Sequence, residues 1–270
     1  MGDGIVCSVS NRDGRLERAT RTNLAIIVGV TDYVEEELRF PACENNVSIV
    51  RDLLLGSGKF SVIVLPSDDA KNLISQIADV IGNFRSKDIG EVFFYFTGHG
   101  EFVNDGLRFM LRDYSTERSA QTTLENSELD RLLGSLSPTL VVKVVDACFS
   151  GALHLKCSAG FADKMMAQPQ NAFSKYYFLS ALQTDQKSWV NGISDFTREF
   201  VKAVANSSLD TIRYRDVIDR LLDASINSAR HSPLYVIQGK CEEVFGIFSA
   251  VARKRLKDRL FFFEKVADFP

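Results

Sequence analysis

The sequence predicts an α/β domain with a mostly parallel central sheet and helices on both of its faces. Short continuous apolar runs recur along the chain, as is typical of strands that are buried on both faces. Segments with apolar residues at helical spacing separate these runs, and this alternation favours parallel strands joined by helical crossovers. The chain has 270 residues, of which 45% are hydrophobic and 25% charged, so it is long and apolar enough to form one large core.

The first half of the chain contains predicted strands and helices in strict alternation. A strand is expected at 24–30 (LAIIVGV), a helix over 47–54, a strand at 61–65 (SVIVL), a helix over 70–84 and a strand at 91–96 (EVFFYF). The first helix ends near two glycines, which commonly terminate helices. We expect the third strand to stop at the Thr-Gly-His-Gly sequence that follows it.

The second half continues the alternation around one segment that has no periodicity. That segment, residues 151–174, is expected to be a loop. The first helix of this half is expected to have Asn126 or Ser127 as its N-cap. The other predicted elements are a short strand at 107–111, a helix over 129–136, strands at 140–145 and 176–180, helices over 196–204 and 214–222, and a last strand at 234–237 with 244–248 as a candidate continuation.

No internal repeat or change of composition divides the chain, so we expect one folded domain. Residues 1–22 are polar and are expected to form an N-terminal tail before the domain at 23–249. Residues 250–270 carry a basic run that leads into a Leu-Phe-Phe-Phe sequence, and they predict a C-terminal helix. Two interpretations of this helix stay open: a solvated helix that packs its aromatic residues on its own domain, or an amphipathic helix that binds a membrane or a partner.

Charge and cysteine content exclude several classes of protein. The 32 Lys and Arg and 35 Asp and Glu residues give a net charge of −3, so the chain has no general attraction for nucleic acid. No uncharged apolar run is long enough to predict a transmembrane segment, and the charged N-terminus lacks the apolar core of a secretory signal. The five cysteines are widely spaced without a C-x-x-C pair, which argues against disulfides or zinc and favours a reducing, cytoplasmic location.

Two predicted strands end in residues of complementary chemistry, His99 and Cys148. Because the carboxyl ends of parallel strands share one edge of a sheet, we expect the imidazole and the thiol to meet there. An imidazole can accept the thiol proton and so generate the nucleophilic thiolate. The backbone N–H groups of Gly100 and Cys148 are candidates for an oxyanion hole. Considered separately, each residue has a non-catalytic interpretation: Cys148 as a small buried apolar residue and His99 as an ordinary loop residue.

The segments FFYFTGHGE (93–101) and VVDACFSG (144–151) resemble the histidine and cysteine motifs of the caspase-like cysteine peptidases, nearest to metacaspases and bacterial caspase homologues. His99 precedes Cys148 by 49 positions, and the caspase histidine lies about 50 residues before its cysteine. The resemblance covers residues 23–248 and implies a three-layer caspase-like (caspase-hemoglobinase) sandwich. It also implies a cysteine endopeptidase that works by a Cys148–His99 dyad through a thioacyl-enzyme. The other similar segments lie at 29–54, 180–188, 195–204 and 231–236.

The resemblance also places a substrate-binding pocket at Asp146, Cys43, Asn46 and Thr97. Metacaspases carry the same acid two residues before the cysteine, and a carboxylate there favours cleavage after Arg or Lys. Asn46 stands where metacaspases carry Asp, which leaves the choice between Arg and Lys open, although an amide beside Asp146 would suit Arg. Each of two residues also has a structural alternative to substrate binding. In these alternatives, Asp146 bonds only to backbone amides, and Cys43 is a buried residue at the start of a helix.

The sequence gives least information on how the activity is regulated and on which cofactors it needs. Many metacaspases need calcium, but no acidic residue follows Cys148 before Asp163, so we expect no metal and no cofactor. The loop at 151–174 contains Lys156 and Lys164, where an enzyme that cuts after basic residues would process itself; an unprocessed loop is the alternative. We expect a protein or peptide substrate and a zymogen activated by processing or by a regulatory protein. The alternative function is a catalytically silent caspase-fold signalling or scaffold module.

Overall fold

The computed structural model describes residues 21–103, 106–150, 173–183, 192–226 and 232–266. Its main sheet has eight strands, six of which follow the order β2-β1-β3-β6-β7-β9. Neighbours from β2 to β7 are parallel, β9 is antiparallel to β7, and β4 and β5 extend the sheet antiparallel beside the end of β3. The strands are β1 (Thr22–Gly29), β2 (Ser61–Leu65), β3 (Ile89–Val103), β4 (Gly106–Met110), β5 (Thr123–Glu125), β6 (Leu140–Ser150), β7 (Lys175–Gln183) and β9 (Ser232–Gln238).

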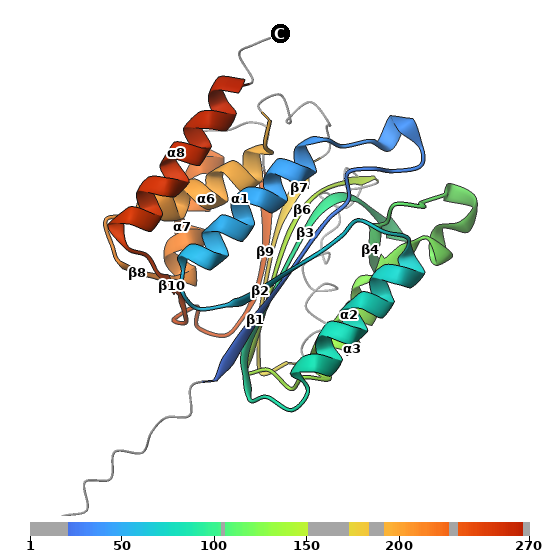
Figure 1. Ribbon diagram of the computed structural model, residues 1–270, viewed down its shortest axis with the longest axis horizontal. Helices are drawn as coiled ribbons and strands as arrows, with labels where there is room; N and C mark the ends of the chain where they lie inside the picture. Colours follow the sequence, from blue (N-terminus) through green and yellow to red (C-terminus); the bar gives the residue numbers. More distant parts are fainter. Residues whose placement is uncertain (1–20, 104–105, 151–172, 184–191, 227–231, 267–270) are drawn as a thin grey trace, which may run out of the picture.

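Helices cover both faces of this sheet, with α2 and α3 on one face and α1, α6, α7 and α8 on the other (Figure 1). This three-layer arrangement confirms the predicted fold class. Two short strands, β8 and β10, form a separate antiparallel sheet. Among the described residues, no helix has both the length and the apolar character that a membrane span requires. The remaining elements are α1 (Ala42–Gly56), α2 (Ala70–Phe84), α3 (Asn126–Gly134), α6 (Asp195–Ala205), α7 (Tyr214–Ile226), α8 (Ala250–Val266), β8 (Thr211–Arg213), β10 (Val244–Ile247) and the 3-10 turns η1 (Glu36–Leu38) and η2 (Thr116–Gln121).

Successive residues of the central strands enter two separate cores. In β3, Phe93 and Tyr95 pack toward α1 and α6, whereas Phe94 and Phe96 pack toward α2 and α3. This alternation follows from the two-residue period of a strand. Because each face is covered by helices, both sets of side chains are apolar, which explains the uninterrupted apolar runs.

Both strands that carry the candidate catalytic residues are longer than predicted. β3 continues through His99 to Val103, and β6 continues through Cys148 to Ser150, so the expected strand ends were wrong. β3 remains paired with β6 over this extension and also pairs with β4, where Gly100 lies opposite Phe109. The glycines are therefore held in an extended ladder, where the sequence had indicated a turn.

Two further expectations need correction. Residues 244–248 do not continue the last strand of the main sheet, since Val244–Ile247 forms β10 and pairs with β8. The N-cap of α3 is Glu125, which makes no side-chain cap bond, while Asn126 is the first helical residue and turns its side chain into the core. There it accepts a hydrogen bond from Lys143, a partner 17 positions away that a local capping signal does not reveal.

Lys143 is a fully buried cation in the middle of β6. Its Nζ atom lies 2.6 Å from Asp130 Oδ1 and 2.5 Å from Asn126 Oδ1, both on α3, and 5.1 Å from the centre of the Tyr176 ring. Burial lowers the pKa of Lys143, and the nearby Asp130 carboxylate opposes this change. The ion pair therefore fixes the position of α3 on the sheet.

We predict that Lys143→Met lowers the free energy of unfolding by about 3–5 kcal/mol, because Asp130 is left as a buried charge without its counter-ion. The double variant Lys143→Met/Asp130→Leu should regain most of this loss, since no unpaired charge is left. Urea denaturation followed by circular dichroism measures both values. A single variant as stable as the wild type would contradict the prediction.

Candidate active site

The register of the sheet places His99 beside Cys148. The two residues are direct Cα partners in the parallel ladder of β3 and β6, and Thr97 and Asp146 are partners two positions earlier. Neighbouring strands lie about 4.8 Å apart, so the backbones of His99 and Cys148 are adjacent. The ladder thus brings together the two residues whose chemistry the sequence analysis singled out.

His99 is held in an aromatic pocket formed by the segment between β1 and α1. The side chain is 4% exposed, and its ring centre lies 5.1 Å from that of Tyr33 and 4.8 Å from that of Phe40. The imidazole Nε2 atom lies 2.9 Å from the carbonyl oxygen of Leu38, the last residue of η1. Three residues of one short segment therefore fix the orientation of the ring.

The Leu38 carbonyl also determines which imidazole nitrogen carries the proton. A carbonyl oxygen only accepts hydrogen bonds, so Nε2 of His99 must be the donor in this contact. In the neutral ring, the lone pair then resides on Nδ1. His99 is thus prepared to accept a proton at Nδ1.

The backbone of His99 is fixed by Tyr33. The His99 N–H donates to the Tyr33 hydroxyl at 2.8 Å, and this hydroxyl donates to the Met110 carbonyl at 3.3 Å. The approach depends on Gly98, because a Cβ atom there would come within 2.8 Å of the Tyr33 hydroxyl oxygen. Gly98 also has a φ of +157°, which disfavours any other residue.

Burial lowers the pKa of His99 below its usual 6.5, and the hydrogen bond to Leu38 opposes part of this change. The neutral ring is therefore the form present near pH 7. Neutral imidazole is the form that can accept a thiol proton.

The predicted pocket residues form one buried polar cluster, placed two register positions before His99 and Cys148. Asn46 donates to Thr97 Oγ1 at 3.0 Å and to Asp146 Oδ2 at 3.4 Å. Thr97 Oγ1 lies 3.5 Å from Cys43 Sγ. The cluster unites α1, β3 and β6, and all four residues are fully buried.

The sequence analysis missed two further members of this cluster, Ser194 and Thr197. The Ser194 hydroxyl donates to Asp146 Oδ2, and Thr197 Oγ1 donates to the same oxygen at 2.5 Å. Because the Thr197 proton is used there, the Tyr95 hydroxyl must be the donor in its 2.6 Å contact with Thr197. Burial raises the pKa of Tyr95 far above its usual value, which keeps this proton in place.

Ser194 also begins α6, since its hydroxyl accepts a hydrogen bond from the Thr197 N–H at 3.1 Å. Its backbone N–H donates to Asn46 Oδ1 at 3.0 Å, so both ends of the Asn46 amide are engaged. A serine directly ahead of an amphipathic helix was a visible N-cap signal. Its contact with Asp146 could not be predicted from local sequence.

The other predicted residues are placed as follows. Gly100 lies opposite Phe149 in β6, one position beyond the His99–Cys148 pair. Most of the loop expected at 151–174, including Lys156 and Lys164, lies outside the described residues. Within the described ranges, no group of three or more His, Cys, Asp or Glu side chains could hold a metal ion.

Comparisons with known proteins agree with this architecture. The profile of the caspase domain, Peptidase_C14, matches residues 22–232. The protein GSU0716 from Geobacter sulfurreducens has a crystal structure that aligns with a TM-score of 0.59 and 15% identity, over 84% of this chain and all of that one. The Drosophila initiator caspase Dronc aligns with a TM-score of 0.55 and 11% identity, over 92% of this chain and 97% of its own. At these identities the structures show a shared fold. No curated protein sequence matches the chain.

We predict that His99 titrates below pH 6.5, because burial favours the neutral ring. Protonation then opposes folding, so this residue's contribution to stability is lost as the pH falls from 6.5 toward the lowered value. Proton NMR of Cys148→Ala protein measures the midpoint without coupling to the thiol.

The variant Phe40→Ala in the same background should raise this midpoint toward 6.5, because it admits water to the ring. His99→Gln assigns the signal among the three histidines of the chain. A midpoint at or above 6.5 in the Cys148→Ala protein would contradict the prediction.

Proposed function

The chain belongs to the caspase-domain family, and on that premise we propose that it is a cysteine endopeptidase with Cys148 as nucleophile and His99 as general acid and base. The observation that carries this proposal is the direct register pairing of His99 with Cys148, combined with the Leu38 contact that leaves Nδ1 of His99 able to accept a proton. Sheet register and imidazole tautomer are independent features. Both favour proton transfer from thiol to imidazole.

In the proposed reaction, the Cys148 thiol proton passes to Nδ1 of His99 and the thiolate attacks the substrate carbonyl carbon. A C–S bond forms, and the carbonyl π electrons move to the oxygen, where the N–H groups of Gly100 and Cys148 stabilise the negative charge. When the tetrahedral intermediate collapses, the C–N bond breaks and imidazolium protonates the leaving amine. Water then attacks the thioester with His99 as base, which releases the acid and restores the thiol.

We propose that the buried cluster around Asp146 selects substrates with Arg or Lys before the scissile bond. The carboxylate supplies the charge that binds a cationic side chain. The hydroxyls of Ser194 and Thr197 and the amide of Asn46 hold it in one orientation. Asn46 Oδ1 accepts one hydrogen bond, from the Ser194 N–H, and an amide oxygen has a second lone pair that suits a guanidinium donor; the choice between Arg and Lys stays open.

Asp146 is fully buried in this structure, and a substrate side chain reaches it only after this part of the molecule rearranges. This supports the further proposal that the chain is a zymogen, activated by processing or by a regulatory partner. The same burial is the observation that favours the alternative function, a catalytically silent module with the caspase fold. Enzymatic assay separates these two possibilities.

We predict hydrolysis of fluorogenic peptides that end in Arg or Lys, and a loss of roughly a thousandfold or more in Cys148→Ala, which lacks the nucleophile. Peptides ending in Asp or Ala complete the panel, and each is tested with and without calcium. Cys241→Ala, which removes a buried cysteine outside the candidate site, is the matched control and should retain activity.

Cleavage after Asp would contradict the role of Asp146 but keep the nucleophile assignment. Folded wild type that cleaves none of the peptides, before or after limited proteolysis, would favour the silent module.

We predict that Tyr33→Phe lowers kcat about tenfold with little change in KM, because the ring stays in place while the hydroxyl that fixes the His99 backbone is lost. Tyr33 is thus a positioning residue. Tyr114→Phe, which removes a buried hydroxyl bonded to Glu101, is the matched control for stability. Equal kcat values for wild type and Tyr33→Phe would show that the hydroxyl has only a structural role.

A further inference from the structure

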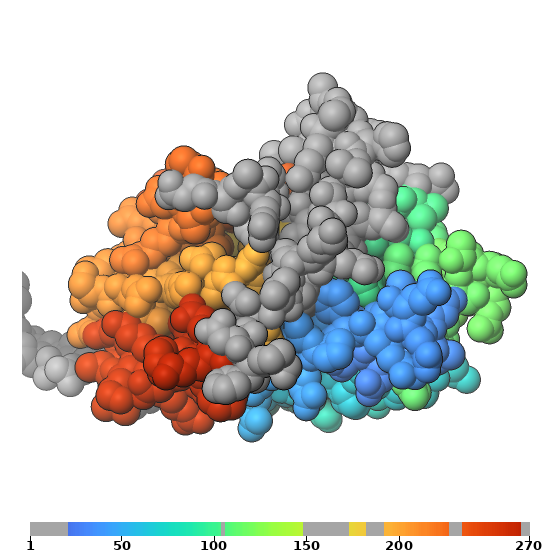
Figure 2. All heavy atoms as spheres, turned by 90° about the horizontal axis from the view of Figure 1, so that it is seen from above, coloured from blue at the N-terminus to red at the C-terminus, as the bar shows by residue number. Residues whose placement is uncertain are grey.

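One face of α8 is largely exposed, although Arg255 on this face contacts Asp52 of α1. Leu256, Leu260 and Phe263 point inward and are buried, and the helix forms an outer surface of the molecule (Figure 2). On the opposite side, Val251 is 79% and Phe262 58% exposed. The family profile ends at residue 232, so α8 lies beyond the matched region.

Four exposed residues form a straight seam along this face: Val251, Arg255, Asp258 and Phe262. They are separated by four, three and four positions, which is the spacing of residues that meet a neighbouring helix in a two-helix contact. The side chains of Arg255 and Asp258 are 72% and 65% exposed. The seam therefore has apolar residues at both ends and opposite charges in the middle.

The seam is complementary to itself when its direction is reversed. Val251 and Phe262 are equally far from the midpoint between Leu256 and Lys257, and Arg255 and Asp258 are also equally far from it. If two helices cross antiparallel at this midpoint, Val251 faces Phe262 of the second copy and Arg255 faces Asp258 of the second copy. The twofold axis repeats each contact, as an isologous interface requires.

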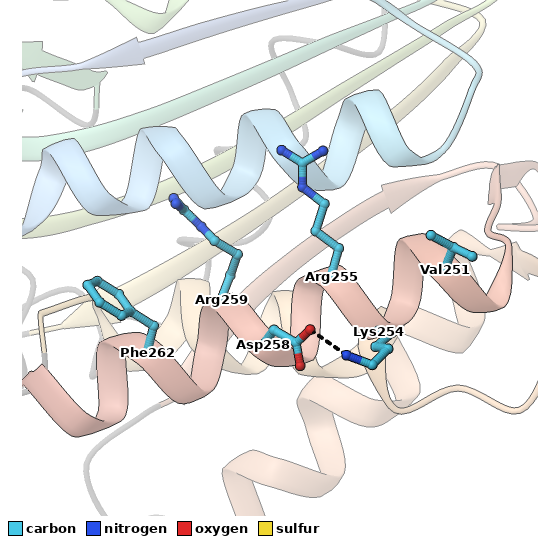
Figure 3. A pocket seen from close by; sticks show the side chains of 6 residues that line it. All are labelled: Val251, Lys254, Arg255, Asp258, Arg259 and Phe262. Carbon is cyan, nitrogen blue, oxygen red and sulfur yellow. Dashed lines mark hydrogen bonds and ion pairs between the residues drawn. The ribbon is translucent and has the colours of Figure 1, made fainter.

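We propose that α8 is a homodimer interface, in which two copies of the chain pack this seam antiparallel about a twofold axis. Figure 3 shows Val251 and Phe262 at opposite ends of the face, with Arg255, Asp258 and Lys254 between them. These residues and Arg259 line a shallow depression of about 520 Å³, which offers room for apolar side chains of a second helix.

The two charges that flank the seam, Lys254 and Arg259, are compatible with this pairing. Arg259 and Arg255 both lean toward α1, and Arg259 lies 2.6 Å from Ser48 Oγ and 3.6 Å from Asp52. Lys254 lies on the other flank of the seam, 2.8 Å from Asp258 of the same helix. In an antiparallel pair each flank meets the same flank of the second copy, so Lys254 and Arg259 do not face each other. The Arg255–Asp52 contact, at 3.4 Å, leaves most of the Arg255 side chain exposed.

The alternation of charge favours a second copy over an anionic membrane surface. A membrane of one sign attracts Lys254 and Arg255 but repels Asp258, which occupies the middle of the seam. A second copy supplies the opposite charge at each position. Leu55 and Ile247 are also exposed, and Gly56, next to Leu55 in the chain, lies against Ala252 at the start of α8.

Sedimentation equilibrium of the full chain tests the proposal. Protein concentrations of about 10–500 µM are needed, because a single helix pair buries less surface than a standard interface of roughly 1,600 Å² and should therefore bind weakly. Wild type should show a concentration-dependent dimer. Arg255→Asp and Asp258→Arg should each weaken it at least tenfold, because like charges then face each other across the axis. The double variant Arg255→Asp/Asp258→Arg should restore dimerisation to within about threefold of wild type.

Mixing the two single variants gives an independent readout. Their seams carry opposite charges, so they should associate with each other although neither associates with itself. Lys257→Glu, an exposed change on α8 outside the seam, is the control and should leave the dimer intact. Circular dichroism confirms that each variant is folded.

Wild type that stays monomeric at every concentration would overturn the proposal, as would a dimer that the single charge reversals do not weaken. Co-sedimentation with phosphatidylserine/phosphatidylcholine vesicles tests whether this face of α8 binds a membrane instead of a second copy of the chain. Vesicle binding that Lys254→Glu abolishes, in a protein that forms no dimer, would assign the face to a lipid surface.

Discussion

The parallel pairing of β3 with β6 is the constraint on which the rest of the site depends. A register shift of one residue would turn every side chain of a strand to the opposite face of the sheet. Polar contacts hold β3 at the start and within the pairing: Glu91 accepts hydrogen bonds from Lys59 and Tyr214, and Thr97 accepts one from Asn46. These groups are buried, so another register would leave a carboxylate and several hydroxyls without partners. The polar residues thus specify the register that apolar strands alone would determine less sharply.

The strand β6 extends this principle to the helices on either side of it. Lys143 faces α3 and is satisfied by Asp130, whereas Asp146 faces the other layer and is held by hydroxyls from α6 and the Asn46 amide from α1. Apolar faces pack in many closely related arrangements, but a buried charge is satisfied only where its partners stand at hydrogen-bond distance. Each layer is therefore tied to β6 by a polar cluster. The Asp146 cluster lies two positions before the His99–Cys148 pair, so the packing of α1 and α6 is tied to the geometry of the candidate active site.

The sequence was sufficient to predict the sheet and its covered faces, because these depend on periodicity and chemical type. The expectation that His99 and Cys148 lie side by side agrees with their pairing in the sheet. The sequence was not sufficient to predict the hydrogen bond that sets the tautomer and orientation of the His99 ring. Every residue has a carbonyl, so nothing in the sequence distinguishes Leu38, and only the path of the segment between β1 and α1 brings it to Nε2. Gly98 and Gly100 favoured a turn locally, yet pairing with β6 and β4 keeps them extended. Local signals described local structure well, while contacts between distant segments depended on the fold.

The C-terminal helix shows the same limit on the molecular surface. Its basic run and aromatic residues are compatible with a packed helix, a membrane-binding helix or a protein interface, because composition alone does not say which face is buried. Because Leu256, Leu260 and Phe263 face the domain, the outward face of the helix is defined. The order of charges along that face differs from what the overall composition of the helix suggests. Averaged over the helix the charge is basic, but along the seam positive and negative charges alternate between apolar ends. A surface of uniform negative charge complements the average charge of the helix. The order of charges along the seam is complemented only by a partner that carries the same residues in reverse order. A second copy of this chain is such a partner.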